Sequence, residues 1–453
     1  MSNAIEAFAA FLAAGRRDYS AAAVKRSATS ILDTVGCMLL GSGEPATKAA
    51  IEAFGAWGRG PAMVAASGLG LAPPWAALVN AVAAHALDFD DWDFPGSTHP
   101  SAVMVPALLA VMSEGAFSGA DLVDAHIAGF EVIARMGEAV NLSHYRLGWH
   151  ATGTLGALGA AAACARALRL DAAQAANAIS IATSMAGGYV SQFGTMTKPF
   201  HAGFAAKAGV VASRLAACGV TAGAAALDGP AGFAKLMVEP GEARFAPALA
   251  KLGRPWAIEE HGICLKPYPS CSYTHRSIDA ALEARAGMDA DLDAIERVDV
   301  SLPDFHLAIL PFGVPETTEQ ALFSTAWCVA VALARGDVGV ADFTPAAIRQ
   351  PMLRALAART SVTARKPKDP RQNCDPQDPD TVRVALRGGG ARSAAVGTGL
   401  GTPGNPMSDE RVDAKFAQCA ARRLPADRAK TLLALLRDLP AAPSLAPLLQ
   451  ALG

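Results

Sequence analysis

The sequence predicts a mainly α protein in which a smaller α+β domain is inserted into a large all-helical domain. Three observations support this fold class. Residues 1–265 read as one helix after another, several of them with an N-cap residue or a terminal glycine. Within residues 266–404, two segments alternate apolar and polar side chains with the period of a strand. The helical pattern returns in residues 405–453, so we expect both ends of the chain to build the helical domain around the insertion.

Length and composition agree with two domains. A chain of 453 residues is too long for one compact core. It is 52% hydrophobic and 18% charged, and because Ala and Gly carry much of the apolar fraction, we expect helices that approach one another closely. A net charge of −2 and the lack of a basic run argue against binding to nucleic acid or to an anionic membrane surface.

The sequence also predicts a compartment. Its most apolar windows are shorter than a membrane span, and no signal peptide is recognisable, so we expect a cytoplasmic protein. The eight cysteines form no Cys-x-x-Cys pair, which is a poor match to zinc or iron–sulfur ligation. Free thiols fit a reducing compartment, and we expect neither a metal nor a cofactor.

In the first part of the chain, caps and glycines mark the helix ends. Ser118 is a good N-cap, Gly41 follows an apolar run, Pro74 suits a first turn, and Asp171 begins a sequence like a capping box. The stretch 154–165 carries Gly and Ala on every side and should be buried all round. The expected helices are residues 27–40, 47–57, 74–87, 118–140, 152–169, 171–186 and 201–219.

In the rest of the chain, helices and strands are mixed. The expected strands are residues 294–302, 381–387 and the shorter 361–364. The expected helices are residues 316–335, 345–358 and 408–449. Segments rich in proline or glycine are expected to form a surface loop at 366–380 and a linker at 388–406.

The stretch Gly194–His201, GTMTKPFH, places Lys198 directly before a proline. Proline is excluded from a helix interior, so Lys198 belongs to a loop or to the start of the helix that follows. Thr195, Thr197 and His201 would give this point the polar wall of a pocket. A solvated loop lysine is the alternative.

A second polar stretch, HALDFDD, ends the helix expected at residues 74–87. His85, Asp88 and Asp91 are spaced by one turn and can share a face. A helix C-terminus disfavours negative charge, so the aspartates need a cation or hydrogen-bond donors nearby; a solvated acidic cap is the alternative. With Asp93 they also resemble a magnesium-chelating cluster, although no second aspartate-rich helix completes a metal cage.

Two more stretches carry histidines. His99 directly precedes a proline, where alone it would be a loop histidine. His150 stands just before a small-residue helix, close to Tyr145 and Arg146. A helix N-terminus can hold an anion, and it lowers the pKa of a histidine beside it, which leaves a neutral base.

A fourth stretch, KPYPSCSYTH, lies at the predicted junction between the domains, where binding sites commonly form. It adds Lys266, Cys271 and His275 to the candidate site residues.

Taken in order, the strings HALDFDD, STHPSA, GWHATGTLGALGAAAA, FGTMTKPFHAG, KPYPSCSYTH and GNPMSDERVDAKF resemble the MmgE/PrpD family of 2-methylcitrate dehydratase, cis-aconitate decarboxylase and iminodisuccinate epimerase. The resemblance covers essentially the whole chain. It implies a large all-helical domain made from both chain ends, an inserted α+β lid domain, a homodimer, and a site between the domains that uses no metal or cofactor. Closely packed Ala/Gly-rich helices fit a dimer.

Matched by motif, the resemblance implies Asp88, His99, His150, Lys198 and Lys266 as site residues, with Tyr145 beside them. Together with the residues of the polar stretches, these give two sets of candidates. The catalytic candidates are Asp88, His99, Tyr145, His150 and Lys198. The substrate-binding candidates are Asp91, Arg146, Lys266, Cys271 and His275. Two positions depart from the decarboxylases of the family, which carry histidine at Cys271 and tyrosine at Trp327. These differences weaken a decarboxylase assignment.

The chemistry of such a family begins by removing a proton next to a carboxylate, which needs a base and cations that hold the developing enolate charge. We expect His150 to act as base or acid, oriented by a carboxylate such as Asp88. Lys198 and Lys266 would bind substrate carboxylates or stabilise the enolate.

The sequence therefore predicts a cofactor-independent lyase, a hydro-lyase similar to 2-methylcitrate dehydratase, that acts on a small di- or tricarboxylate. One alternative is an epimerase of an amino- or imino-dicarboxylate in which Lys198 and Tyr145 are opposed acid and base. Two other classes are a magnesium-dependent helical enzyme and a non-enzymatic carboxylate-binding protein.

Overall fold

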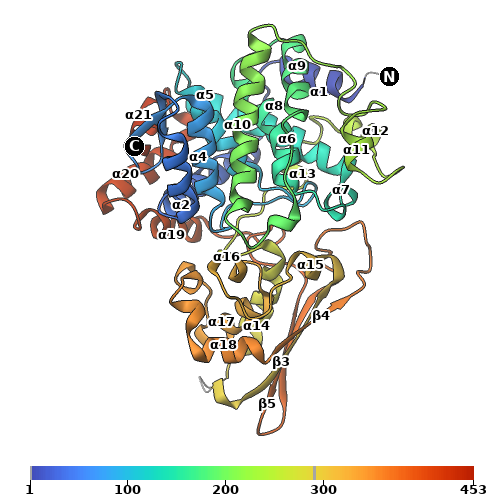
Figure 1. Cartoon of the computed structure of the whole chain (residues 1–453), viewed down its shortest axis with the longest axis vertical. Helices are drawn as coiled ribbons and strands as arrows, with labels where there is room; N and C mark the ends of the chain where they lie inside the picture. The colour runs from blue at the N-terminus through green and yellow to red at the C-terminus, as the bar shows by residue number, and fades with distance from the viewer. Residues whose placement is uncertain (1–2, 289–291) are drawn as a thin grey trace.

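The computed structural model describes residues 3–288 and 292–453, and it is mostly helical with a small mixed sheet. Figure 1 shows a large helical body, which holds both chain ends, above a smaller part that contains the sheet. The helices of the body are α1 (Ala4–Ala13), α2 (Ala21–Gly41), α3 (Pro45–Phe54), α4 (Pro73–His85), α5 (Pro100–Met112), α6 (Gly119–Val140), α7 (Ser143–Arg146), α8 (Ala151–Ala167), α9 (Ala172–Thr183), α10 (Thr197–Ala217), α11 (Phe233–Met237), α12 (Phe245–Ala250), α13 (Ala257–Glu260), α19 (Asp409–Ala420), α20 (Ala426–Arg437) and α21 (Ala446–Leu452).

Helix α8 lies at the centre of this body and packs against α5, α6, α9 and α10. Every one of its residues is buried, as the Gly/Ala composition predicted. A Cβ atom added at Gly159 would lie 2.1 Å from Cγ1 of Ile133 on α6, and one at Gly209 of α10 would lie 2.4 Å from Cβ of Ala160. Small residues therefore set the close spacing of the helices around α8.

Local capping explains several helix ends. Ser118 accepts a hydrogen bond from the backbone N–H of Asp121 and begins α6 with a capping box, and Asp171 begins α9 in the same way with Gln174. Both starts were predicted from the sequence.

Several elements of the helical body differ from expectation. Helix α1 was not predicted, and the helix expected at 408–449 is divided into α19, α20 and α21. Residues after α3 form a hairpin of β1 (Arg59–Val64) and β2 (Leu69–Leu71), where only helices were expected. Helix α5 was not predicted, because each of its residues is buried and its apolar side chains show no helical period. It also holds Pro106, which reads as a helix breaker.

The smaller part contains a four-stranded sheet of order β4-β3-β5-β6. Its strands are β3 (Ile295–Pro303), β4 (Thr360–Arg365), β5 (Asp380–Leu386) and β6 (Ala391–Val396). β3 is parallel to β4 and antiparallel to β5, and β6 is antiparallel to β5. Its helices are α14 (His275–Arg285), α15 (Asp304–Ile309), α16 (Thr318–Ala321), α17 (Thr325–Arg335) and α18 (Pro351–Ala358).

The alternating apolar side chains that predicted β3 and β5 are the side chains that the sheet buries. Val298, Val300, Val382 and Val384 are buried beneath helices, and α14 packs on β5 and β6. Three expectations for this part were wrong. The expected linker 388–406 contains β6, the expected helix 316–335 is interrupted where Ser324 caps α17, and the helix expected from residue 345 begins at Pro351.

The C-terminal helices return to the helical body. α19 packs on α2, and Lys415 of α19 lies 2.7 Å from Oδ1 of Asp33 on α2 and donates to the carbonyl of Phe89 at 2.7 Å. The domain boundaries at residues 265 and 404 stay predictions, as does a lid role for the smaller part. Across the described residues, every helix is too short or too polar to cross a membrane.

Candidate active site

The aspartate-rich stretch is a loop, not a helix end. α4 ends at His85, and Asp88 has a left-handed backbone with φ of 50°. Aspartate tolerates this conformation better than most residues do. Because the chain leaves the helix before Asp88, the shared helical face expected for His85, Asp88 and Asp91 is wrong.

Two lysines from distant parts of the chain hold Asp88. Its Oδ1 lies 2.7 Å from Nζ of Lys266 and 2.9 Å from Nζ of Lys198. Lys266 also donates to the backbone carbonyl of Asp88 at 2.9 Å. Lys198 lies in the first turn of α10, at the helix start that its proline neighbour predicted. The aspartates were expected to need a cation nearby. For Asp88, the predicted site lysines Lys198 and Lys266 supply it.

The three charges shift one another's pKa values. Burial alone would raise the pKa of Asp88, but Lys198 and Lys266 outweigh it and hold that pKa well below its ordinary value. Burial lowers the pKa of Lys198, and Lys266 adds repulsion that Asp88 does not fully offset. For Lys266, burial is outweighed by Asp88 and Asp90, so its pKa is raised. Lys266 stays charged, and Lys198 is the lysine that can exchange a proton.

The ammonium of Lys198 keeps hydrogen-bond donors free. Although it is ion-paired with Asp88, it has no hydrogen-bond partner of good geometry among the described residues. Its Nζ lies 5.5 Å from the ring centre of Phe193 and 5.0 Å from that of Phe323. The charge is thus held over apolar rings, with donors left for an anion.

His99 stands directly before α5 and touches the same carboxylate. Its Nδ1 lies 2.8 Å from the hydroxyl of Thr152, and its Nε2 lies 3.2 Å from Nζ of Lys266 and 3.3 Å from Oδ1 of Asp88. Burial, reinforced by Lys266, lowers the pKa of His99 to about 3. The ring is therefore neutral.

His150 caps the start of α8, and its partner is another histidine. Its Nδ1 lies 2.9 Å from Nδ1 of His201, and its Nε2 has no partner among the described residues. Burial, with repulsion from His201 and Lys198, lowers the pKa of His150 well below its ordinary value. A neutral ring is as expected, and the role of His150 as a base stays a prediction. The expectation that Asp88 orients this ring was wrong, because the two lysines and His99 take up that carboxylate.

A narrow cavity lies against these groups. Its lining residues are Asp88, Trp92, Ser97, Thr98, His99, Tyr145, Phe193, Lys198, Cys271, Ser272, Tyr273 and Phe323. Five of the predicted site residues are among them. Lys266 lies beneath Asp88, and His150 lies behind Phe193 with ring centres 4.8 Å apart.

Two neutral groups face this cavity opposite the charges. Burial raises the pKa of Tyr145 well above its ordinary value, and burial raises that of Cys271 to about 12. Tyr145 therefore keeps its proton near neutral pH, and Cys271 is a poor acid.

Besides Lys266, three predicted substrate-binding residues do not line the cavity. Asp91 is buried and accepts the backbone N–H of Ser101 at 3.1 Å. His275 has its Nε2 3.1 Å from the carbonyl of Ser270. Arg146 points outward, where its guanidinium lies 5.5 Å from the ring centre of Phe305. Substrate binding by these three side chains stays a prediction.

The aspartates of the loop point to different partners. Asp90 pairs with His85 at 2.8 Å, and Asp93 accepts the backbone N–H groups of Gly96 and Thr98 at 2.6 and 2.8 Å. Lysine ammonium groups occupy Asp88. Asp88 and Asp90 lie with His85 and His99 so that one ligand atom of each is within 4.8 Å of the others, a group that could hold a metal ion. Asp91 and Asp93 bind separate partners, so the aspartates of the loop do not all converge as the magnesium cluster considered above would require.

Sequence reasoning missed two contributions to the site. The His85–Asp90 pair was overlooked because a spacing of five residues brings no pair together on a helix. The loop at 366–380, expected only at the surface, reaches the cavity wall, where the amide of Asn373 donates to the hydroxyl of Ser97 at 2.8 Å. Polar Ser97 beside the motif THP was the available signal for the second.

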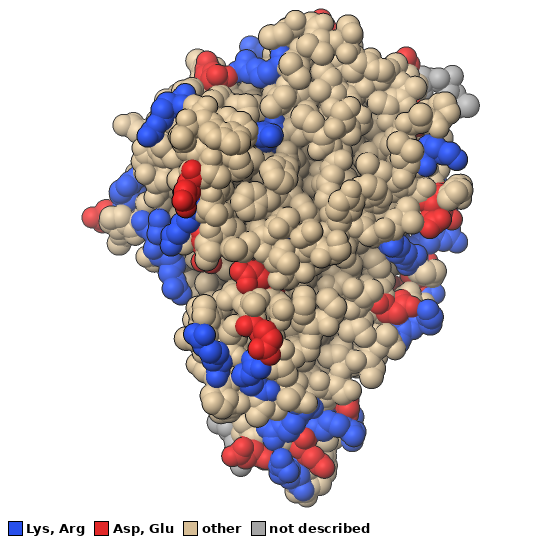
Figure 2. Space-filling model, in the orientation of Figure 1, with Lys and Arg blue, Asp and Glu red and all other residues tan. Residues whose placement is uncertain are grey.

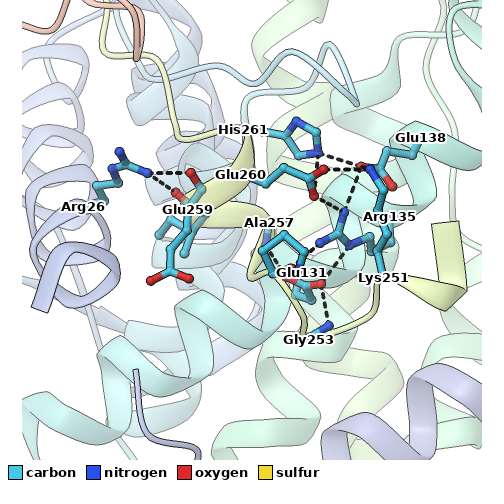
Figure 3. A network of polar contacts seen from close by, with 12 residues as sticks. Arg26, Glu131, Arg135, Glu138, Lys251, Gly253, Ala257, Glu259, Glu260 and His261 are labelled. Atoms are coloured by element: carbon cyan, nitrogen blue, oxygen red, sulfur yellow. Dashed lines mark hydrogen bonds and ion pairs between the residues drawn. The ribbon is translucent and has the colours of Figure 1, made fainter. Parts of the chain in front are cut away.

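A polar network fixes the segment that delivers Lys266 (Figure 3). On α6, Arg135 donates to Glu131 at 2.9 Å and to Glu260 of α13 at 2.8 Å. Glu131 in turn accepts the backbone N–H of Ala257 at 2.6 Å. These contacts hold α13 to α6. The segment that follows α13 therefore has a fixed position against the aspartate loop.

That meeting point is a short bridge between the two segments. The backbone N–H of Cys264 donates to the carbonyl of Trp92 at 2.8 Å, and the N–H of Trp92 donates back at 2.9 Å. Lys266 follows two residues later, directly beneath Asp88.

Comparison with known proteins identifies the family of the chain. The MmgE/PrpD N-terminal domain matches residues 6–246, and the MmgE/PrpD C-terminal domain matches residues 268–440. The chain is 29% identical over 438 residues to the cis-aconitate decarboxylase of Homo sapiens, covering 92% of this chain and 87% of that protein. It is 27% identical over 453 residues to the cis-aconitate decarboxylase of Aspergillus terreus, covering 95% and 91%. With both domains matched in order along nearly its whole length, the chain belongs to the MmgE/PrpD family.

Proposed function

We propose that this chain is a cofactor-independent hydro-lyase that removes a proton next to a carboxylate of a small di- or tricarboxylate and expels water. The family and the decarboxylase relatives indicate an enzyme of the lyase type. The observation that carries the proposal is Lys198, a buried ammonium that lines a cavity, is paired with one carboxylate and keeps donors for an anion.

The elimination can be assigned to groups in and behind the cavity wall. Neutral His150, with its unpaired Nε2, takes the proton from the carbon beside the substrate carboxylate. Lys198 gives a proton to the hydroxyl that leaves from the next carbon, so that a carbon–carbon double bond and water are formed. Lys266 stays charged and holds Asp88 in place, which keeps a positive charge beside the developing enolate.

Decarboxylation is the second candidate, because the similar proteins named above are cis-aconitate decarboxylases. Loss of carbon dioxide leaves a carbanion that an acid must protonate. At Cys271 the cavity offers a thiol with a pKa raised to about 12 by burial, where the decarboxylases are expected to offer an imidazole. The dehydration proposed above uses Lys198 as its acid and needs no acid at position 271, so we favour the hydro-lyase.

One experiment separates these reactions. Citrate, 2-methylcitrate, cis-aconitate and an amino-dicarboxylate are incubated with the protein in deuterated water and followed by NMR. We expect loss of water from a hydroxy acid. Loss of carbon dioxide would instead establish a decarboxylase, and deuterium exchange with inversion alone an epimerase. Binding of the acids without any reaction would refute an enzymatic role.

We also propose that the protein is a homodimer. On α10, Phe204 and Leu215 form an apolar stripe that is not buried within the chain, since Phe204 is 44% and Leu215 39% exposed. Figure 2 shows few charged side chains on the face of the helical body around α10. A second copy of this chain that packs against this face would cover the stripe.

A further inference from the structure

His85 is a fully buried histidine with one ring nitrogen in use and one free. Its Nδ1 lies 2.8 Å from Oδ2 of Asp90, and its Nε2 has no hydrogen-bond partner among the described residues. Burial alone would raise the pKa of Asp90, but His85 and His99 outweigh it, so that carboxyl is ionised. Asp90 therefore accepts the proton of Nδ1, and Nε2 presents a lone pair.

His85 lies at the rear of the site. His85 lines a second narrow cavity together with Asp88 and Lys198. Lys198 lines this cavity and also the one that holds Tyr145, so it stands between the two. The second cavity is also lined by Thr195 and Met196, which are exposed, and thus leads from the solvent to His85.

Every element around His85 contributes a titratable or charged group. The ring of His85 is nearly parallel to that of His150, with ring centres 5.8 Å apart and an angle of 22°, and its centre lies 4.4 Å from that of His99. Beyond Asp90, the Asp33–Lys415 ion pair joins α2 to α19. Among the described residues, the groups that interact electrostatically with His85 include Asp88, Asp90, His99, His150, Lys198 and His201. Glu44 and Glu319 line the second cavity with it.

We infer that His85, oriented by Asp90, is the relay that returns a proton to Lys198 after each turnover. This inference rests on the proposed function, in which Lys198 gives its proton to the leaving hydroxyl. His85 acts through Lys198 and is therefore a positioning residue.

The relay conserves atoms and charge. A proton from solvent in the second cavity binds Nε2 of His85, and the resulting imidazolium faces the Asp90 carboxylate through Nδ1–H. The Nε2–H bond then breaks as an N–H bond forms at Nζ, which restores the ammonium of Lys198. The proton that His150 removed from the substrate leaves to solvent, so one proton enters for each one released.

The test compares His85→Asn and Asp90→Asn with the wild-type protein, on whichever of citrate, 2-methylcitrate or cis-aconitate the wild type converts. Asparagine at position 85 can still donate to Asp90 but has no titratable nitrogen. We expect kcat to fall by about 10²-fold and KM to change less than about threefold, because proton transfer and not binding is impaired. Added imidazole should raise kcat of His85→Asn with concentration, which a merely structural defect would not show.

His126→Asn is the matched control. His126 is equally buried and has hydroxyl partners on both nitrogens, Ser27 at 2.9 Å and Ser101 at 2.8 Å, but it lines neither cavity. It should keep kcat within about threefold and be insensitive to imidazole. The inference is overturned if His85→Asn keeps wild-type kcat, or if its loss is not rescued by imidazole.

A second measurement does not depend on turnover. Long-range proton–nitrogen NMR of the histidine rings reports the tautomer of His85 in the wild type and in Asp90→Asn. We expect Nδ1–H in the wild type and loss of that tautomer in the variant. An Nε2–H tautomer in the wild type would refute the relay. A wild type that converts none of the acids would refute the proposed function instead.

Discussion

His150 and His201 face each other through their Nδ1 atoms, which lie 2.9 Å apart. Burial lowers the pKa of both rings, that of His201 to about 4, so both are neutral near pH 7. A hydrogen bond between two neutral rings needs one Nδ1–H donor and one Nδ1 acceptor, so the two rings hold opposite tautomers. If His150 is the donor, its Nε2 carries the lone pair that a base needs.

The first prediction concerns His201 as the hydrogen-bond acceptor for Nδ1–H of His150. His201→Leu removes the partner of His150 Nδ1 and should lower kcat by at least about tenfold, with a loss of roughly 1 to 3 kcal/mol in the free energy of unfolding. His201→Gln keeps an acceptor and should retain more activity. Steady-state kinetics and urea unfolding check both variants, and wild-type turnover in His201→Leu would contradict this role.

The second prediction concerns Lys198. If it protonates the leaving group, Lys198→Ala should lower kcat by about 10² to 10³, which is roughly 3 to 4 kcal/mol of transition-state stabilisation. Lys198→Arg keeps the charge but cannot donate a proton near neutral pH, so it should be as inactive as alanine. Lys207→Ala, on the same helix with Nζ 4.9 Å from the ring centre of Trp75, is the control. A folded, fully active Lys198→Ala protein would show that the site is wrong.

The third prediction concerns metals. Activity should survive exhaustive treatment with EDTA, because lysine ammonium groups occupy Asp88 and the other loop aspartates bind separate partners. The measurement is turnover before and after chelation. Complete loss that magnesium restores would revive the metal-dependent alternative.

The fourth prediction concerns pH and stability. Burial lowers the pKa of His126 and His275 to about 3 and that of His144 to about 4, against an ordinary value of 6.5. The unfolded chain then binds protons that the folded chain does not, so stability is complete above pH 6.5 and falls as the pH drops toward 4. Between its folded and unfolded pKa values, each such histidine adds about 1.4 kcal/mol per pH unit to the slope of the free energy of unfolding against pH.

Urea unfolding at pH 8, 7, 6 and 5 measures this slope. His126→Gln should make it shallower, because one buried imidazole is removed. Asp88 and Asp90, whose pKa values are lowered, act only at low pH. Burial raises the pKa of Asp380 to about 6, and this carboxyl opposes the histidines because the folded chain binds its proton first. The comparison of wild type with His126→Gln cancels this contribution, and an equal slope in the two proteins would contradict the prediction.

The fifth prediction concerns assembly. Light scattering at micromolar concentration should give the mass of a dimer, and Phe204→Lys combined with Leu215→Lys should give a monomer, because two charges would be buried in the interface. Met352→Lys, at a residue 54% exposed on α18, is the control and should leave the dimer intact. A wild-type monomer would refute the proposed interface.

The fold was predictable where side-chain pattern and packing agree. Ser118 and Asp171 gave correct helix starts, and the alternation around Val298 and Val382 gave correct strands. Helix α5 could not be found, because a helix buried on all sides has no polar face to set a period. β6 escaped because its burial pattern shows a largely exposed edge strand next to glycines.

The site was predictable as a set of residues but not as a set of contacts. The sequence motifs indicated Asp88, Lys198 and Lys266, and these meet at one oxygen atom. The partner of His150 was missed because His201 comes 51 residues later, and only the packing of α8 against α10 brings them together. Long-range pairs of this kind follow from tertiary structure and leave no local pattern.

The ion pair of Lys415 with Asp33 and its hydrogen bond to the carbonyl of Phe89 have a consequence for folding during synthesis. A ribosome makes the aspartate loop first, Lys266 later and α19 after both. Until α19 has emerged, neither the carboxyl of Asp33 nor the carbonyl of Phe89 has its Lys415 partner. A nascent chain should therefore be catalytically silent until α19 has been made.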